Sequence, residues 1–310
     1  MNAQQNLTKR PYFLTDGGIE TTLIFHEGWD LPEFAVFPLV STPTGRDALV
    51  RYYERYLQLA KKHGCGFILE APTWRASPRW ASLIGYSNDE LAGMLRDTAG
   101  MLAELRESYV SEDLPILISG CIGPQDDGYK PDVQLSVDAA FAYRSFQILE
   151  FAKTDVDLVT AVTMTYPEEA IGIANAAAFA GLDCVVSFTL ETDGRLPTGE
   201  LIHEAIRNVD EQAVTPPIYY MINCAHPDHF GALFAQPADW HGRIGGVRAN
   251  ASRLSHAELD EADVLDEGDP QEFGEQHGLL VKCLPNLKVI GGCCGTDHRH
   301  VDAAGSNLPQ

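Results

Sequence analysis

Three cysteines that follow two apolar segments are the residues of this sequence best suited to chemistry. Cys293 and Cys294 stand side by side in Gly291-Gly-Cys-Cys-Gly-Thr296, and Cys224 ends the apolar run 218–224. Glycines on both sides of the adjacent pair free the backbone to turn, so both thiols can face one point. Thiolates are ligands that suit zinc, and three protein ligands leave a fourth position open, as in a catalytic site. The pattern favours a catalytic zinc site.

The residue types alone also fit other interpretations. Vicinal cysteines can form a redox couple, and a glycine-rich turn after a strand can cradle a phosphate. A buried cysteine is most often inert packing, which is our interpretation of Cys65, Cys184 and Cys283. Cys121 follows another apolar run and should border the same region, but packing is again the simplest role. From chemistry alone, zinc, redox and phosphate sites remain open.

The elements that must position these cysteines are short apolar runs, rich in β-branched residues, that alternate with segments of helical periodicity. The runs are 12–16, 65–70, 115–120, 156–163, 184–189, 218–224, 244–249 and 288–292. The helical segments are 46–63, 88–109, 137–153, 168–180, 199–209, 228–234 and 271–283. Such alternation predicts an α/β fold, a single (β/α)8 TIM barrel, with a doubly wound open sheet as the alternative.

No linker rich in Pro, Gly or Ser divides the chain, so residues 1–310 are expected to form one domain, with 1–10 as a flexible N-terminal tail. In a barrel, chemistry gathers at the carboxyl ends of the strands. Cys224 and the pair Cys293-Cys294 follow the sixth and eighth strands, which are next but one around the barrel. The three thiols can therefore reach one centre.

Charge and composition exclude several classes of function. The chain has 44 acidic against 22 basic residues, a net charge of −22, which repels phosphate backbones and anionic lipid. Nucleic-acid and membrane partners are therefore not expected, although a homo-oligomer is compatible with the sequence. The acidic segment 258–275 is interpreted as a solvated surface. Neither a signal-peptide core nor an apolar run of membrane-spanning length is found, so a cytoplasmic location, where thiols stay reduced, is expected.

The pairing of Asn223-Cys224 with the C-terminal Gly-Gly-Cys-Cys-Gly-Thr resembles the homocysteine S-methyltransferase family. Further segments resemble that family in order and spacing, over about residues 12–304: Thr15-Asp-Gly-Gly-Ile-Glu20, Phe67-Ile-Leu-Glu-Ala-Pro-Thr73, Ser119 to Pro124, and Ser187-Phe-Thr with Asp193-Gly-Arg-Leu. The resemblance implies a TIM barrel with zinc on Cys224, Cys293 and Cys294. It also implies methyl transfer from a small activated donor to a thiol, with homocysteine as acceptor and methionine as product.

The resemblance also suggests which residues bind substrate. Asp16 and the amides of Gly17 and Gly18 are expected to hold an amino-acid head group, with a turn-forming role as the alternative for Asp16. Glu70 is expected to serve the same pocket or to orient Thr73 and backbone amides. The full expected set is Asp16, Gly17, Gly18, Glu70, Thr73, Thr163 and Asn223. No general base is required, because coordination to zinc removes the thiol proton and leaves the sulfur nucleophilic. A cationic donor, a sulfonium or quaternary ammonium, would suit an acidic mouth lined by aromatic residues. The candidates for that lining are Trp74, Trp80, Tyr129 and Tyr166.

Two departures from the family pattern bear on the substrate. Val162-Thr163 stands where many members carry Glu-Thr, whose carboxylate is associated with the substrate ammonium. Asn250-Ala-Ser-Arg253 replaces a turn that often ends in an acidic residue, so Arg248 or Arg253 is a candidate to face a carboxylate. The alternatives to homocysteine methylation are a zinc barrel acting on another small thiol or C–S substrate, and a non-catalytic zinc-containing binding protein.

Overall fold

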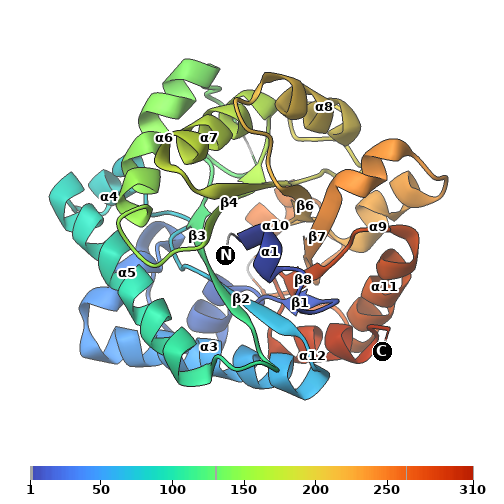
Figure 1. Ribbon diagram of the computed structural model, residues 1–310, viewed down its shortest axis with the longest axis horizontal. Helices are drawn as coiled ribbons and strands as arrows, with labels where there is room; N and C mark the ends of the chain where they lie inside the picture. Colours follow the sequence, from blue (N-terminus) through green and yellow to red (C-terminus); the bar gives the residue numbers. More distant parts are fainter. Residues whose placement is uncertain (1–2, 130, 263, 310) are drawn as a thin grey trace.

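In the computed structural model, which describes residues 3–129, 131–262 and 264–309, eight parallel strands close into a barrel in the order of the sequence. The strands are β1 (Phe13–Leu14), β2 (Gly66–Glu70), β3 (Ile116–Ile122), β4 (Leu158–Met164), β5 (Asp183–Phe188), β6 (Tyr219–Asn223), β7 (Ile244–Ala249) and β8 (Val289–Gly292). Helices surround them, and Figure 1 looks along the barrel. The predicted TIM barrel is confirmed and the open sheet is excluded, because β1 pairs with both β2 and β8.

The helices begin and end at recognisable signals. The longer ones are α3 (Pro43–His63), α5 (Asn88–Tyr109), α6 (Val137–Phe151), α7 (Pro167–Ala180), α8 (Ile202–Gln212) and α11 (Pro270–Cys283), and a shorter one, α12 (His298–Ser306), ends the chain's helices. Ser87 and Glu90 form a capping box at the start of α5. Gly64 and Gly181 end α3 and α7 in the left-handed conformation, as expected for glycine at that place. Helices α4 (Pro78–Leu83), α9 (Pro227–Phe230), α10 (His256–Asp260) and α12 are short, and the sequence pattern predicted only the region of α9.

Alternation along the strands divides the barrel interior into layers. The lowest layer is apolar and consists of Phe13, Ile68, Leu117, Leu158, Val185, Met221 and Val289. Two residues further along their strands the buried side chains are mostly polar: Glu70, Ser119, Thr160, Ser187, Asn223 and Arg248. The barrel therefore has an apolar floor beneath a polar upper interior that faces the carboxyl ends of the strands.

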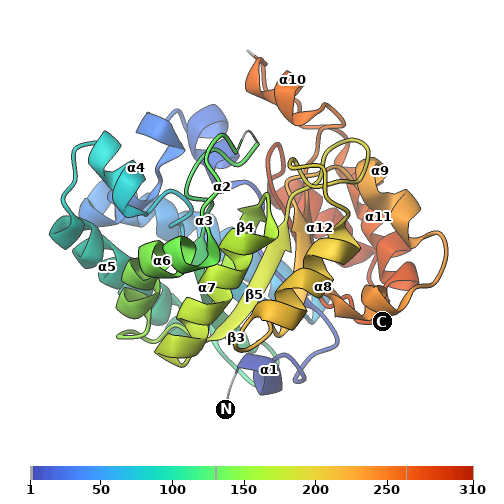
Figure 2. The ribbon, with the colours of Figure 1, turned by 90° about the horizontal axis from the view of Figure 1, so that it is seen from above.

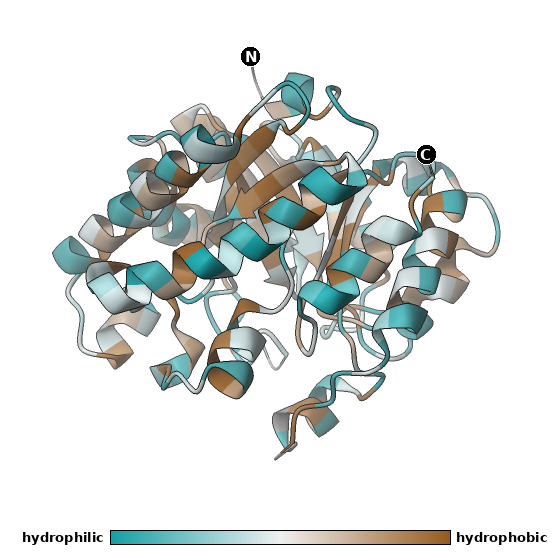
Figure 3. Cartoon of the chain, turned by 90° about the horizontal axis from the view of Figure 1, so that it is seen from below, coloured by the Kyte–Doolittle hydropathy of each residue, from teal (hydrophilic) through white to brown (hydrophobic). Residues whose placement is uncertain are grey.

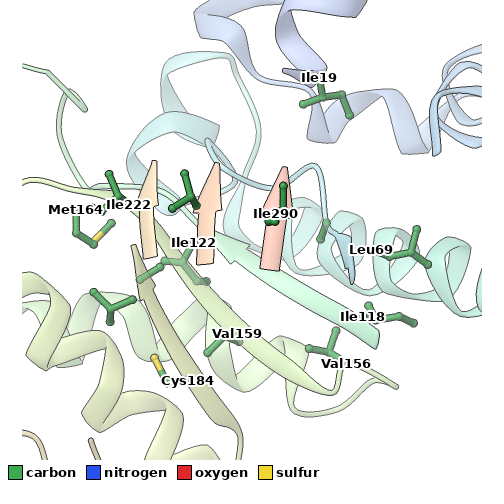
Figure 4. Packing of buried hydrophobic residues seen from close by; sticks show 14 of the residues in the cluster. Ile19, Leu69, Ile118, Ile122, Val156, Val159, Met164, Cys184, Ile222 and Ile290 are labelled. Atoms are coloured by element: carbon green, nitrogen blue, oxygen red, sulfur yellow. The ribbon is translucent and has the colours of Figure 1, made fainter. Parts of the chain in front are cut away.

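The strand residues that face outward pack against the helices and form the larger core. Figure 4 shows Ile118, Val159, Ile222 and Ile290 in this layer, together with Cys184. Cys65 and Cys184 are buried in the same cluster, which agrees with their expected packing role, whereas Cys283 is exposed. The hydropathy colouring in Figure 3 shows hydrophobic strands enclosed by helices whose outer faces are hydrophilic. No helix in the described part of the chain is long and apolar enough to cross a membrane.

The sequence suggested a flexible tail over residues 1–10, and part of this segment, Ala3 and Leu7, packs against the barrel. Helix α1 (Ala3–Asn6) lies over the barrel axis in Figure 1, at the end opposite to α10 in Figure 2. Ala3 and Leu7 are buried against the apolar floor, and the Ala3 amide donates to Asp183 at 3.1 Å. These two apolar residues close the lower end of the barrel. The sequence pattern did not indicate this role, because the segment around them is mostly polar.

Ala3 and Leu7 thus form a plug at the lower end of the barrel. Removing this plug is expected to destabilise the protein without changing the opposite end of the barrel. A chain beginning at Lys9 would expose the apolar floor and lose about 2–4 kcal/mol of unfolding free energy. Urea denaturation measures the loss, while zinc content and thiol binding should be unchanged. A loss below about 0.5 kcal/mol, the range of ordinary surface changes, would contradict the plug.

Candidate active site

The three cysteines converge at the upper end of the barrel. Cys224 directly follows β6, and Cys293 and Cys294 directly follow β8. The Cys224 sulfur lies 3.1 Å from that of Cys293 and 3.4 Å from that of Cys294. Backbone hydrogen bonds position both segments on β7, since the Cys224 amide donates to Arg248 O and the Cys293 amide to Ala249 O. Strands six and eight thus present their thiols to one point from either side of strand seven.

The chemistry of these donors fits a soft metal ion. All three sulfurs lie within 4.8 Å of one another, and tetrahedral zinc with bonds of about 2.3 Å would need them only slightly further apart than the two measured distances. Hydrogen bonds from Cys224 and Cys294 hold the pKa of Cys293 well below its usual range, and the bond to Cys293 raises the pKa of Cys224. The cluster therefore favours one cysteine as a thiolate beside two neutral thiols. If all three sulfurs are thiolates, their mutual repulsion requires a cation between them.

Two residues of the site have a backbone conformation that side chains rarely adopt. Thr163 has a φ of 61° and Cys224 a φ of 56°. This conformation is especially unfavourable for a β-branched residue such as threonine. Asn223 compensates, because its Oδ1 accepts from the Thr163 amide at 2.8 Å and its Nδ2 donates to Thr163 Oγ1 at 2.9 Å. The same Oδ1 accepts from Ser187 Oγ at 2.6 Å. Asn223 therefore fixes the irregular end of β4 beside the three sulfurs.

Changing Asn223 to alanine is expected to lower the free energy of unfolding by about 2–4 kcal/mol, because buried partners lose their hydrogen bonds and the strained backbone of Thr163 is no longer compensated. Urea denaturation at saturating zinc would measure this loss. Asn175→Ala is the matched control, since that amide accepts one hydrogen bond from Val214 near the surface, and a loss below about 1 kcal/mol is expected for it. Equal losses for the two variants would show that Asn223 has no special positioning role.

Tyr129 covers the pocket side of the sulfur triangle. Its hydroxyl lies 3.3 Å from the Cys224 sulfur and 3.5 Å from the Cys294 sulfur. Its ring stacks on His256 with centroids 4.1 Å apart, and His256 contacts Glu191 at 3.0 Å and the Cys224 carbonyl at 2.8 Å. The loop after β3 is therefore tied to the three-cysteine cluster through an aromatic side chain with a polar end.

Asp16 and Arg248 form a buried ion pair at the pocket floor. Arg248 Nη2 donates to Asp16 Oδ1 at 2.7 Å, and the Tyr52 hydroxyl donates to Asp16 Oδ2 at 2.9 Å. Burial raises the pKa of Asp16, an effect that the charge of Arg248 opposes. Arg248 Nε also donates to Gly292 O at 3.1 Å. The pair thus joins the turns after β1 and β8 to β7, and Arg248 does face a carboxylate, although that carboxylate belongs to Asp16.

A cavity of about 350 Å³ opens beside the three cysteines. The polar upper interior of the barrel forms its floor, and two segments with apolar side chains form its rim. The rim residues are Ile24, Phe25, Phe34, Leu259, Ala262, Val264 and Leu265. Phe25, Phe34 and Val264 are 52%, 54% and 79% exposed, so the rim is wide open. Helix α10, which carries Leu259, projects above the barrel in Figure 2.

Most, but not all, of the expected substrate-binding residues lie in this cavity. Asp16, Gly17, Gly18, Glu70, Thr163 and Asn223 line it. Thr73 does not line it, because its hydroxyl donates to the Cys121 carbonyl at 2.7 Å and ties the segment after β2 to β3. The Gly18 amide is also engaged, since it donates to Thr296 O at 3.0 Å. Head-group binding by that amide therefore does not fit the geometry.

Of the aromatic residues that were expected to line the cavity, some do so and others have a different role. Trp74 and Tyr129 line the cavity. Trp80 instead covers the Arg75 guanidinium, 3.7 Å from its ring centroid, and the Tyr166 hydroxyl accepts from the Leu135 amide. Arg253 lies outside the cavity and binds Asp228 and Glu272. Cys121 borders the cavity as expected.

Glu20 and Arg75 line the cavity although the sequence pattern did not single them out. Glu20 was visible only as the last residue of the segment Thr15–Glu20, where nothing indicated the direction of its side chain. Arg75 is held between Trp74 and Trp80, and its partner Asp127 lies 3.9 Å away on the loop after β3. Such pairings depend on the barrel bringing distant loops together.

The fold and site define a (β/α)8 barrel enzyme with a three-cysteine centre beside a small-molecule cavity. The family model for homocysteine S-methyltransferase matches residues 13–308, so the chain belongs to the homocysteine S-methyltransferase family and is a methyltransferase. Among solved structures it is similar to the metallated form of the homocysteine methyltransferase MmuM from Escherichia coli. That match has a TM-score of 0.74, 19% identity, and coverage of 98% of this chain and 99% of that one.

The oxidized form of the same Escherichia coli protein gives a TM-score of 0.73 at 20% identity, with 97% and 98% of the two chains covered. At this level of identity the likeness concerns the fold. A search of curated proteins gave no significant match.

Proposed function

We propose that this enzyme transfers a methyl group from a small activated donor to the thiol of homocysteine, giving methionine, with zinc held by Cys224, Cys293 and Cys294. The convergence of three sulfurs within 4.8 Å on the wall of the cavity is the observation that carries this proposal. Membership of the homocysteine S-methyltransferase family supports it, as does the similarity to a homocysteine methyltransferase that has a metallated form.

Bound zinc would keep a substrate thiol deprotonated at neutral pH, which makes its sulfur nucleophilic. The chain's own residues provide alignment. Asn223 fixes the irregular end of β4 at Thr163 beside the sulfurs, and the Tyr129 hydroxyl is positioned to donate a hydrogen bond to an arriving sulfur. Because oxidised cysteines cannot bind zinc, the proposal also places the protein in a reducing compartment such as the cytoplasm.

Val162 supports a second candidate, a different small thiol or C–S substrate. The side chain is apolar, lines the cavity and is 6% exposed, so it offers no partner for a substrate ammonium at the end of β4. Val162→Glu separates the two candidates. If homocysteine is the natural acceptor, the change should not improve its binding, and a marked improvement would indicate another acceptor.

The direct test is methionine formation, followed by mass spectrometry, from homocysteine and a panel of sulfonium and quaternary ammonium donors. Activity should disappear after zinc is removed with a chelator and return when zinc is restored. Zinc-loaded protein that forms no methionine with any donor, yet methylates another thiol, would favour the second candidate. Protein that binds zinc and thiols without any turnover would be a binding protein.

A further inference from the structure

Two carboxylates in the cavity have no counter-ion in the described part of the chain. Asp16 is paired with Arg248 at 2.7 Å, and Asp127 with Arg75 at 3.9 Å, so the basic side chains that line the cavity are already matched. Asp266 lies at the exposed rim and accepts from Ser252. Glu20 and Glu70 also line the cavity, but no basic side chain of the described residues lies within ion-pair distance of either.

Glu70 is the more deeply placed of the two. It ends β2, is 5% exposed, and its Oε1 accepts from Thr160 Oγ1 at 3.1 Å. Its Oε2 is buried and has no hydrogen-bond partner among the described residues. Buried carboxylate oxygens are rarely left without a partner, because the loss of water is not compensated. Because Glu70 lines the cavity, a ligand that reaches this carboxylate would supply the partner that its buried oxygen lacks.

Glu20 adds a second negative charge to the same space. It lies in the short helix α2 (Ile19–Thr21) directly after the turn that contains Asp16, and its side chain is half-buried. Burial raises the pKa of Glu20 to about 7 and that of Glu70 to about 7 as well. A positive group bound in this cavity would be attracted by both negative charges and would favour the ionised form of each carboxylate.

The other side chains that line the cavity favour an organic cation as the ligand. Hydrophobic side chains from Ile19, Ile24 and Leu265 face the same cavity, as does the indole of Trp74. The cavity, at about 350 Å³, has the size of a small-molecule site. A cationic group on an apolar skeleton satisfies the carboxylates and buries its carbon atoms against these walls.

We propose that Glu20 and Glu70 form a cation subsite that holds the positively charged group of a substrate, either the ammonium of an amino-acid thiol or the onium centre of the methyl donor. This inference rests on the proposed methyl transfer and identifies how its substrates are recognised. It also accounts for Val162, because the countercharge for an ammonium comes from the ends of β1 and β2 and none is needed at the end of β4.

Matched ligands that differ in charge test the subsite on the zinc-loaded protein. For the acceptor arm, equilibrium binding of homocysteine is compared with 4-mercaptobutyrate, which lacks the amino group. For the donor arm, choline is compared with 3,3-dimethylbutan-1-ol, its neutral isostere. The wild type should prefer the charged member of at least one pair, and the pair it discriminates identifies the source of the cation.

In the double variant Glu20→Gln/Glu70→Gln that preference should fall by at least about thirtyfold, while affinity for the neutral member stays constant. Both changes preserve side-chain shape, and zinc content and thermal unfolding show whether the variant is folded. No preference in the wild type, or an undiminished preference in the folded double variant, would overturn the subsite.

The results that would contradict the subsite differ from those that would contradict the proposed reaction. If the wild type forms methionine from homocysteine while the double variant keeps its preference, methyl transfer stands and the subsite is wrong. If the charge preference depends on Glu20 and Glu70 but no thiol is methylated with any donor, the subsite stands and the proposed function is wrong.

Discussion

Exchanging Cys224 for serine is expected to abolish stoichiometric zinc binding and to lower methyl transfer by more than about 100-fold. Loss of a group that only supports a ligand already costs about 10- to 100-fold in affinity or activity, and loss of a ligand should cost more. The serine hydroxyl is a poor replacement for a soft thiolate. Metal analysis of protein prepared without chelator, together with initial rates of methionine formation, measures both effects.

Cys283→Ser is the matched control. This thiol lies at the end of α11, is exposed, and does not line the cavity. Zinc content and rate should therefore equal those of the unchanged protein. If Cys224→Ser protein retained full zinc content and full activity, the metal centre would have to be placed elsewhere.

The sequence was sufficient for the barrel because its evidence is local and repeated. Each strand appears as a short apolar run, and the helix ends at Gly64 and Gly181 are visible as glycines after periodic segments. The three cysteines were also predictable, because strand ends in a parallel barrel meet at one edge. Their approach to 3.1 and 3.4 Å follows from strand order, which the alternation of strands and helices implies.

Features that depend on contacts between distant segments were not predictable. The ion pair between Arg248 and Asp16 joins residues that are 232 positions apart in the sequence. The stacking of Tyr129 on His256 joins two segments that follow different strands. The left-handed backbone of Thr163 has no sequence signal, because threonine normally avoids it. The plug formed by Ala3 and Leu7 was missed because its burial depends on the open lower end of the barrel.

The polar upper interior of the barrel implies a conflict between stability and function. A protein optimised for stability would place apolar residues at the positions of Glu70 and Arg248, as the lowest layer does. A buried carboxylate without a counter-ion reduces stability, and such groups persist where binding requires them. Glu70 therefore offers a way to measure this conflict.

Glu70→Gln is expected to raise the free energy of unfolding of the ligand-free enzyme by about 3 kcal/mol above pH 8. The pKa of Glu70 is raised to about 7 by burial, against an ordinary value of 4.5. Below the ordinary value the group is neutral in both folded and unfolded states, so it imposes no penalty. As pH rises through the interval between the two values, the unfolded chain ionises first, and the wild type loses stability that the glutamine variant keeps.

Urea denaturation of both proteins at about pH 4.5 and about pH 8.5, with zinc present throughout, measures this difference. The two proteins should have nearly equal free energies of unfolding at the lower pH and different ones at the higher pH. Glu112→Gln, at an exposed position, is the control and should change stability by less than about 0.5 kcal/mol at either pH. A cationic ligand should reduce the advantage of the glutamine variant, because it stabilises the ionised wild type by binding to it. An advantage that did not depend on pH would show that burial of the charge is not its cause.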